Sequence, residues 1–241
     1  MGQVPDRKYA IFGDGKVARH FSHYLSLRKI PHSSWSRRTA EAGGASLEEV
    51  AAQADTLLLL ISDSAIEPFI AANAALLSGK QLVHFSGSLF TPRALGMHPL
   101  QSFWPELYRL EVYEKFAWIC DGAMETALSI FPELKNEIFP IDPKQKALYH
   151  ALCVLAGNGS AILWQKLLGD FDLRLNLPAH VAYPYLEQLT ANLLTNPSQA
   201  LTGPIQRQDF ETIEKNLGAL KGDDFEGVYR SLWETQKRGK L

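Results

Sequence analysis

Six residues near the N-terminus form a glycine-rich turn that could bind phosphate. They follow an apolar run at residues 9–12 and are Gly13, Asp14, Gly15, Lys16, Val17 and Ala18. Gly13 can adopt a turn conformation closed to other residues, and Gly15 lets backbone amides approach a pyrophosphate. A helix that starts near Lys16 adds unpaired N–H groups and the positive end of its dipole. With its flanking strand and helix, the turn predicts a dinucleotide site of the Rossmann type.

The end of the second predicted strand indicates which dinucleotide is bound. An acidic residue there would favour the free ribose hydroxyls of NAD, but this chain has Ser36, Arg37 and Arg38. Arginine forms charge-assisted, often bidentate bonds with phosphate oxygens, so these residues favour the 2′-phosphate of NADP(H). The alternative is an arginine pair that is solvated in an ordinary loop.

Candidate catalytic residues stand where later strands end. His84 and Ser86 end one predicted strand, and His98 ends the next. Hydride transfer to a carbonyl or imine leaves a developing charge that a histidine could neutralise. We expect His98 to be the proton donor, because Pro99 restricts its backbone to an extended conformation. For either histidine the alternative is a structural hydrogen bond with a neighbouring carbonyl group.

The path of the cofactor predicts where the reaction takes place. From the glycine turn an extended dinucleotide would pass Ser62 and Asp63, which follow the third strand, and its nicotinamide would end near the later strands. Asn158, on the first helix of the C-terminal half, could complete this centre by binding substrate. Alternatively, the glycines that flank Asn158 only ease helix packing.

Four further polar residues of the C-terminal half have competing interpretations. Lys166 could be catalytic, but a surface lysine is the stronger alternative. Thr202, Arg207 and Asp209 could anchor substrate, and Asp209 could equally cap the helix that follows it.

The elements that must position these residues alternate between strands and helices as far as residue 141. Residues 56–61 form a continuous apolar run, which is typical of a central parallel strand covered on both faces. The apolar runs together predict six or seven strands, and beyond residue 143 the periodicity is helical. We expect an α/β fold in which a Rossmann domain with a doubly wound parallel sheet, residues 1–141, precedes an all-α domain, residues 142–241.

Composition narrows the class of protein. The chain has 241 residues, 46% of them hydrophobic, and a formal net charge of −2, so nothing favours nucleic-acid binding. Two cysteines in no metal-binding pattern are ordinary in a reducing compartment. The N-terminus lacks the features of a signal peptide, and the longest apolar run, residues 56–61, is too short to span a membrane. We therefore expect a soluble cytoplasmic protein without bound metal.

Several motifs spread over the chain carry a family resemblance. Besides the glycine turn they are residues 84–87 (HFSG), 96–103 (GMHPLQSF), 149–151 (YHA) and 201–209 (LTGPIQRQD). Together they resemble a bacterial Rossmann-like family with a domain of unknown function numbered 2520. That family is similar to pyrroline-carboxylate reductase, deazaflavin-dependent NADP reductase and the 6-phosphogluconate and hydroxyisobutyrate dehydrogenases.

The resemblance implies a helical C-terminal domain like that of 6-phosphogluconate dehydrogenase. It also implies NADP binding, a substrate cleft between the domains and a homodimer formed through the helices. Two positions depart from the family pattern, which usually has Gly where Gln208 stands and His near Asn216.

Residues and resemblance together predict an NADP(H)-dependent oxidoreductase that reduces a small carbonyl or imine compound. The alternative is a protein that binds NADPH without turnover, as a sensor or scaffold, and an ionisable group near nicotinamide C4 would favour the enzyme. Residues 36–38 disfavour a flavin- or nucleoside-binding protein. Large apolar residues of the helical domain predict either a dimer interface or packing against the Rossmann domain. They are Trp164, Leu167, Leu168, Tyr183, Tyr185 and Leu186.

Overall fold

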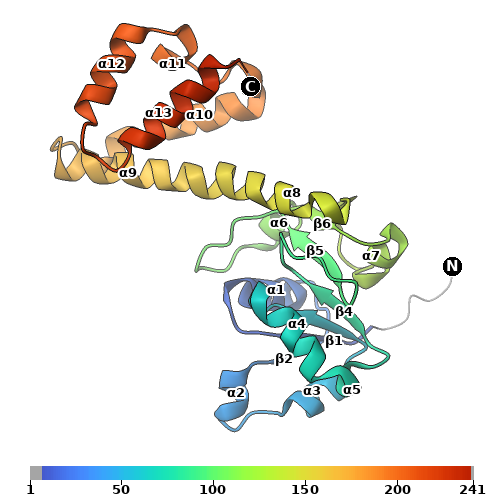
Figure 1. The fold of residues 1–241 in the computed structure, drawn as a ribbon. Helices are drawn as coiled ribbons and strands as arrows, with labels where there is room; N and C mark the ends of the chain where they lie inside the picture. Colours follow the sequence, from blue (N-terminus) through green and yellow to red (C-terminus); the bar gives the residue numbers. More distant parts are fainter. Residues whose placement is uncertain (1–6, 240–241) are drawn as a thin grey trace. The chain divides into compact units, whose positions relative to one another are not determined.

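The computed structural model describes residues 7–239, and its N-terminal half is built on a seven-stranded sheet (Figure 1). The strands lie in the order β2-β1-β3-β4-β5-β6-β7. Their bounds are β1 Tyr9–Phe12, β2 His32–Trp35, β3 Thr56–Leu59, β4 Gln81–His84, β5 Leu95–Pro99, β6 Trp118–Cys120 and β7 Ile138–Pro140. The first five strands are parallel, as the sequence predicts.

The last two strands reverse direction. β6 pairs antiparallel with β5, and β7 runs parallel to β6. An antiparallel neighbour needs no crossover helix on the face of the sheet. The connection from β5 to β6 accordingly carries only the four-residue helix α6 (Leu110–Tyr113). The expectation of a wholly parallel sheet is therefore wrong for these two strands, whose apolar runs contain no signal for direction.

The order of the strands creates a switch point beside β1. The chain passes from β1 to β2 on one side and then returns to place β3 on the other side. Ligands of such sheets bind in the crevice at the carboxyl ends of the strands, where the order reverses. Gly13 leaves β1 at this point with φ +129°, and a Cβ there would lie 2.2 Å from the carbonyl oxygen of Leu60. Only glycine fits this position.

The two faces of the sheet bury separate apolar clusters. Tyr9 and Ile11 point to one cluster, whereas Ala10 and Phe12 point to the other, as alternation along a strand requires. The helices that cover or flank the sheet are α1 Lys16–Leu27, α2 Arg37–Glu41, α3 Leu47–Ala52, α4 Asp63–Ala72, α5 Ala74–Leu77 and α7 Met124–Ile130. Burial on both faces explains why the central strands are continuous apolar runs.

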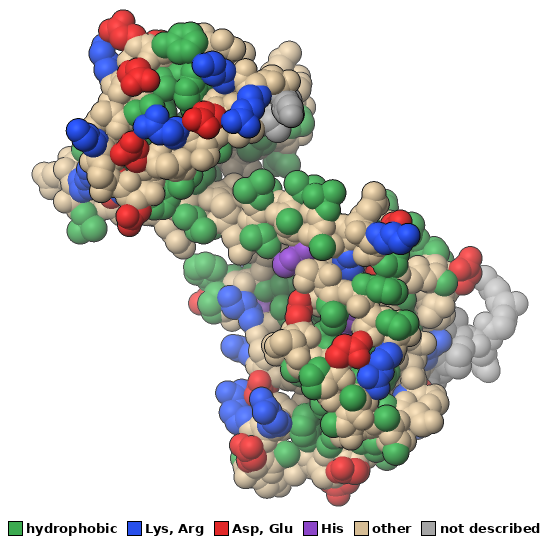
Figure 2. Space-filling view, viewed as in Figure 1, with side chains coloured by type: hydrophobic (Ala, Val, Ile, Leu, Met, Phe, Trp, Pro, Cys, Tyr) green, Lys and Arg blue, Asp and Glu red, His purple; other side chains and the backbone are tan. Residues whose placement is uncertain are grey.

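A long helix follows the sheet. It consists of the 3-10 turn η1 (Pro143–Gln145), α8 (Lys146–Cys153), the π-helical turn η2 (Val154–Asn158) and α9 (Gly159–Leu173). By length and composition this 31-residue helix could cross a membrane: its most apolar 18 residues have a mean hydropathy of 1.3, and none of them is buried. Figure 2 shows hydrophobic side chains at its surface.

The chain divides into two compact units within α9, after Ala161. The first unit contains the sheet and α8. The domain boundary expected after residue 141 lies directly after the last strand, and it stays a prediction. The second unit is helical, and its buried cluster consists of Ile213, Leu217 and Trp233. Besides α9 its elements are η3 Ala179–Ala182, α10 Tyr183–Thr195, η4 Pro197–Gln199, α11 Gly203–Arg207, α12 Phe210–Ala219 and α13 Glu226–Lys237.

Candidate functional site

A pocket of about 700 Å³ opens at the switch point of the sheet. Three segments form it: the glycine turn, the end of β2 with the start of α2, and the end of β3 with the start of α4. Of the residues predicted to bind cofactor, seven line it: Gly13, Asp14, Gly15, Ser36, Arg37, Arg38 and Ser62. Lys16, Val17, Ala18 and Asp63 do not line it, and Ala18 instead packs in the core of the sheet.

Two helices begin at this pocket with available backbone N–H groups. α1 starts after Gly15 and α4 after Ser62, and among residues 7–239 no side chain caps either N-terminus. The first N–H groups of a helix have no hydrogen-bond partner within the helix, so they can donate to a bound anion. The glycine turn therefore presents the donors that a pyrophosphate requires.

Ser36, Arg37 and Arg38 lie at the start of α2, a helix that the sequence did not lead us to expect. Ser36 caps α2, where its Oγ accepts a hydrogen bond from the Thr39 N–H at 3.2 Å, so this hydroxyl is already engaged within the chain. Arg38 pairs with Asp14 across the pocket at 2.9 Å, with 78% of the arginine side chain exposed. An exposed ion pair contributes about 1 kcal/mol or less, so Arg38 can exchange Asp14 for a phosphate.

Part of the pocket wall was not predicted. Trp35 and Phe69 contribute aromatic rings with centroids 6.4 Å apart and tilted by 41°. The other lining residues without a sequence signal are Glu41, Leu60, Ile61 and Ala65. Apart from Glu41, these side chains give the pocket an apolar part that suits a flat ring. A tryptophan at a strand end was visible in the sequence, but its partner on α4 was not.

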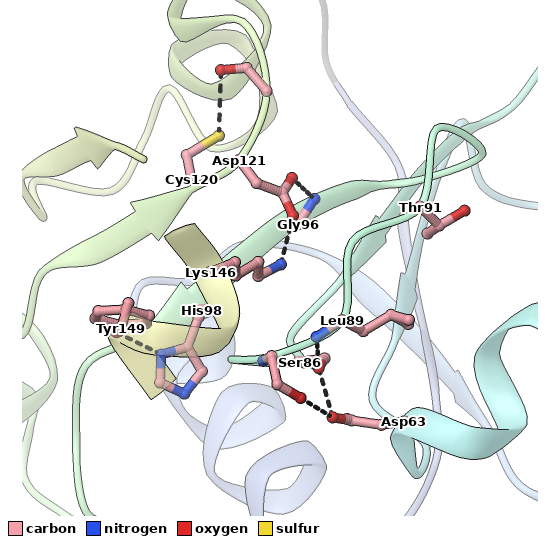
Figure 3. A network of polar contacts seen from close by, with 12 residues as sticks. Asp63, Ser86, Leu89, Thr91, Gly96, His98, Cys120, Asp121, Lys146 and Tyr149 are labelled. Atoms are coloured by element: carbon pink, nitrogen blue, oxygen red, sulfur yellow. Dashed lines mark hydrogen bonds and ion pairs between the residues drawn. The ribbon is translucent and has the colours of Figure 1, made fainter. Parts of the chain in front are cut away.

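Three of the four predicted catalytic residues, His84, Ser86 and His98, lie at or just after the ends of β4 and β5. Figure 3 shows two of them, Ser86 and His98. His98 Nδ1 hydrogen-bonds to the hydroxyl of Tyr149 on α8 at 2.7 Å. The ring of His150 packs edge-on against His98 with centroids 5.8 Å apart. Burial, followed by the nearby charge of His150, lowers the pKa of His98 to about 4. His98 is therefore a neutral imidazole near pH 7.

Ser86 holds the backbone of this region rather than presenting a free hydroxyl. Its Oγ donates to Asp63 at 2.5 Å and accepts from the Leu89 N–H at 2.9 Å (Figure 3). Asp63 also accepts from Ser88 Oγ at 3.2 Å. The carboxylate of Asp63 thus links the start of α4, at the pocket, to the loop that follows β4.

His84 is wholly buried, and neither ring nitrogen has a hydrogen-bond partner among the described residues. Burial is the main cause that lowers its pKa to about 4, and the positive charge of Lys146 lowers it further. His84 is therefore neutral under ordinary conditions. The charges of Lys146 and Asp121 act on it in opposite directions.

Lys146 and Asp121 form a buried ion pair, with side-chain exposures of 1% and 2%. The other oxygen of Asp121 accepts the Gly96 N–H at 2.8 Å. A Cβ on Gly96 would overlap both charged groups, so glycine is required there. Burial lowers the pKa of Lys146, and the hydrogen bond to Asp121 opposes this shift. The pair joins the first turn of α8 to β5 and β6.

The polar residues of α8 share one face of the helix. Lys146, Tyr149, His150 and Cys153 are spaced i, i+3, i+4 and i+7, which places them in one row. The first three contact Asp121, His98 and the space beside Gly87. The leucines of the same long helix, Leu148, Leu152 and Leu155, are instead 57–73% exposed. The helical periodicity beyond residue 143 is therefore correct, but the face of α8 that contacts the sheet is the one that carries the polar residues.

The remaining candidate residues belong to the π-helical turn η2, to α9 and to the helices that follow. Asn158 is exposed in the π-helical turn η2. Lys166 binds Asp223 at 2.6 Å and Asp170 at 2.9 Å, as an ordinary surface lysine would. Asp209 caps α12 by accepting the Thr212 N–H at 3.1 Å.

Thr202 and Gln208 flank the short helix α11, and Arg207 lies in its last turn. Gln208 ends the helix with φ +56° and ψ +41°, the left-handed conformation in which glycine is favoured. The resembling family usually has Gly at this position, so the substitution keeps the helix end and accepts backbone strain. Within the described residues no group of His, Cys, Asp and Glu could hold a metal ion.

Comparison with known proteins identifies a domain and the fold. Residues 120–235 carry the domain described as Domain of unknown function (DUF2520), which confirms the resemblance drawn from the motifs. No curated protein sequence matches the chain.

Solved structures with the same architecture cover nearly all of the chain. A protein from Bacteroides fragilis, provisionally described as an NADP oxidoreductase, is 21% identical with TM-score 0.73, covering 97% of this chain and 99% of its own. A Streptomyces aurantiacus imine reductase is 15% identical with TM-score 0.65 and coverages of 97% and 94%. Plasmodium falciparum pyrroline carboxylate reductase with NADP bound is 12% identical with TM-score 0.59, covering 95% of each chain. The fold is thus a Rossmann-like domain followed by a helical C-terminal domain.

The buried histidines make stability depend on pH. An unfolded histidine binds a proton below pH about 6.5, whereas folded His84 and His98 stay neutral to about 4. The unfolded state therefore gains protons first, and each histidine lowers stability by about 1.4 kcal/mol per pH unit as pH falls through this window. We expect His84→Gln to lose roughly half of the slope in urea unfolding between pH 6.5 and 4. His180→Gln, at an exposed position, is the control, and an unchanged slope in His84→Gln contradicts the account.

The ion pair should behave as a unit. Lys146→Met leaves the Asp121 carboxylate buried without its partner, and we expect a loss of about 3–5 kcal/mol in the free energy of unfolding. Lys146→Met combined with Asp121→Asn should lose clearly less than the sum of the single changes. Lys215→Met, which breaks an exposed pair with Glu211, should change stability by less than about 1 kcal/mol. Additive losses in the double variant would show that the two charges do not depend on each other.

Proposed function

We propose that this protein is an oxidoreductase that uses NADP(H) to reduce a small carbonyl or imine compound. The observation that carries the proposal is the pocket at the switch point, which joins an uncapped helix N-terminus to the side chains of Arg37 and Arg38. The first suits a pyrophosphate and the second a 2′-phosphate. The apolar wall with Trp35 and Phe69 gives room for a flat base.

The likeness of fold supports the same cofactor. The pyrroline carboxylate reductase structure has NADP bound, and the Bacteroides fragilis protein is provisionally described as an NADP oxidoreductase. When bound, the cofactor supplies a hydride from its nicotinamide C4. This chain's own contribution is to hold the pyrophosphate at Gly13–Gly15 and the 2′-phosphate at residues 37–38, and to donate a hydrogen bond to the reduced group from His98.

An ionisable cluster beside the cofactor path favours the enzyme over a sensor or scaffold. A protein that only binds NADPH could line the nicotinamide site with apolar side chains. Here His98, Tyr149 and His150 meet next to the loop that Asp63 and Ser86 tie to the pocket. We propose a small-molecule substrate, a reaction centre that draws on these side chains, and a cytoplasmic location. A cleft between the domains, with Asn158 as a substrate ligand, stays a prediction.

Cofactor choice tests the proposal. We expect NADPH to bind at least ~10-fold more tightly than NADH, about 1.4 kcal/mol, and Arg37→Ala to remove most of this preference by losing contact with the 2′-phosphate. Isothermal titration calorimetry with both nucleotides measures it. Arg109→Ala, an exposed arginine that does not line the pocket, should leave both affinities unchanged. Equal affinities of the wild type for NADPH and NADH would refute the assignment.

We also propose that the chain forms a homodimer through its helical part. The second unit has a small buried cluster yet exposes large apolar side chains on α9 and α10. Leu173 and Leu194 are each 83% exposed, and Tyr185, whose ring contacts Trp164, is 62% exposed. Apolar surface of this extent is commonly covered by a partner. A second copy of the chain is the simplest partner, and it would account for the apolar helix without a membrane.

Light scattering tests the dimer. At micromolar concentration in buffer without detergent, the wild type should have twice the mass of the 26.9 kDa chain. Leu194→Asp should lower the mass toward that of the monomer, because it places a charge on the apolar surface. Leu128→Asp, at an exposed position on α7, should stay dimeric. A monomeric wild type, or one that stays in solution only with detergent, would rule the proposal out.

A further inference from the structure

The environment of His98 distinguishes its two ring nitrogens. Nδ1 is held by the Tyr149 hydroxyl at 2.7 Å. Nε2 lies 3.0 Å from the point where a Cβ on Gly87 would stand. His150 Nε2 lies 3.0 Å from the same point, and the Cδ2 of His150 lies closer still. Because Gly87 has no side chain, both imidazole rings pack directly against its backbone. Within the described residues Nε2 of His98 has no hydrogen-bond partner, so it is the ring nitrogen left for a ligand.

The hydroxyl of Tyr149 is suited to donate toward His98. Burial raises the pKa of Tyr149, with a further contribution from Cys153, so the phenol keeps its proton. A phenol donates well, whereas the thiol of Cys153 is a weaker donor and acceptor. When the phenol proton points to Nδ1, a neutral imidazole must carry its own proton on Nε2.

The charged groups around His98 keep it neutral. From α8, Lys146 and His150 disfavour a second proton on the ring, and from α4 the carboxylate of Asp63 opposes them. Burial outweighs these charges, and the pKa of His98 falls to about 4. The protonation state that matters near pH 7 is therefore a choice between two neutral tautomers.

We propose that Tyr149 is a positioning residue that fixes His98 as its Nε2–H tautomer, which leaves the Nε2 proton available for donation to a ligand. This inference rests on the proposed function, in which His98 faces the group that is reduced. In triosephosphate isomerase a neutral histidine likewise polarises a carbonyl through its N–H group.

The proton transfers balance through the same three side chains. Hydride addition, with NADPH as the reductant, turns a carbonyl oxygen into an alkoxide or an imine nitrogen into an amide anion. That atom forms a bond with the Nε2 proton of His98, and the N–H bond breaks. At the same time Nδ1 takes the phenol proton of Tyr149, and the resulting phenolate is reprotonated by Cys153 or solvent. His98 ends neutral, with its proton on the other nitrogen.

Nitrogen-15 NMR of the full-length protein, labelled at histidine, reads the tautomer directly. The His98 signals are assigned by their absence in His98→Gln. Between pH 6 and 8 we expect wild-type His98 to show a protonated Nε2 and an unprotonated Nδ1. Tyr149→Phe, which removes only the hydroxyl, should lose this preference and give a mixture of tautomers. Tyr185→Phe, which removes an exposed hydroxyl, should keep the wild-type pattern.

The wild-type spectrum decides the matter even if Tyr149→Phe does not fold. A wild-type His98 protonated at Nδ1, or a tautomer unchanged in folded Tyr149→Phe, overturns the inference. Neither result depends on cofactor or substrate. A protein that fails to bind NADPH but shows the expected tautomer would instead overturn the proposed function, so the two failures are distinguishable.

Discussion

The buried ion pair between Lys146 and Asp121 is the constraint on which the arrangement of His98, Tyr149 and His150 depends. Two charges that leave water cost several kcal/mol each, and they are tolerated only when each is paired and hydrogen-bonded. Asp121 meets this condition by binding both Lys146 and the Gly96 N–H. Because the pair has a single satisfactory geometry, it fixes the start of α8 against β5 and β6. Tyr149 and His150, one turn further along the same face, are thereby brought to His98.

The cofactor pocket and the histidine cluster are joined by a short covalent and hydrogen-bonded path. Ser62 lines the pocket, and its neighbour Asp63 binds Ser86. Gly87 follows at once, and the rings of His98 and His150 pack against it. Parallel strands place all these segments at one edge of the sheet, since β1, β3, β4 and β5 end there. The fold thus brings the pocket at the glycine turn and the two histidines to the same edge of the sheet, with few residues between them.

Local sequence patterns predicted the fold where the physical signal was local. The apolar run at residues 56–61, the glycine turn and the strand end at Pro99 all have the predicted structure. The direction of β6 could not be predicted, because an apolar run of three residues looks the same either way. α2 was missed because Ser36 was considered as a phosphate ligand, although its capping box with Thr39 is the stronger local effect.

The sequence predicted some residues of the candidate site but not the contacts between them. His84, Ser86 and His98 were recognised at strand ends, yet Tyr149, His150, Lys146 and Asp121 were not assigned roles. Their roles depend on contacts between α8 and the sheet, and these contacts join residues that are far apart in the sequence. His98 and Tyr149, for example, are separated by 51 positions. The one available signal was the row of polar residues along an otherwise apolar helix.

The central claim is that the cofactor ends beside His98, and a crystal structure with NADPH bound tests it most directly. The account predicts nicotinamide C4 within about 6 Å of His98 Nε2, which leaves a substrate carbon at reacting distance from C4 and its oxygen in hydrogen-bond range of the imidazole. A second groove, of about 390 Å³, runs along α1 beside Arg19, Ser22 and Ser26. A nicotinamide ring bound in that groove, away from Gly87 and His98, would contradict the account.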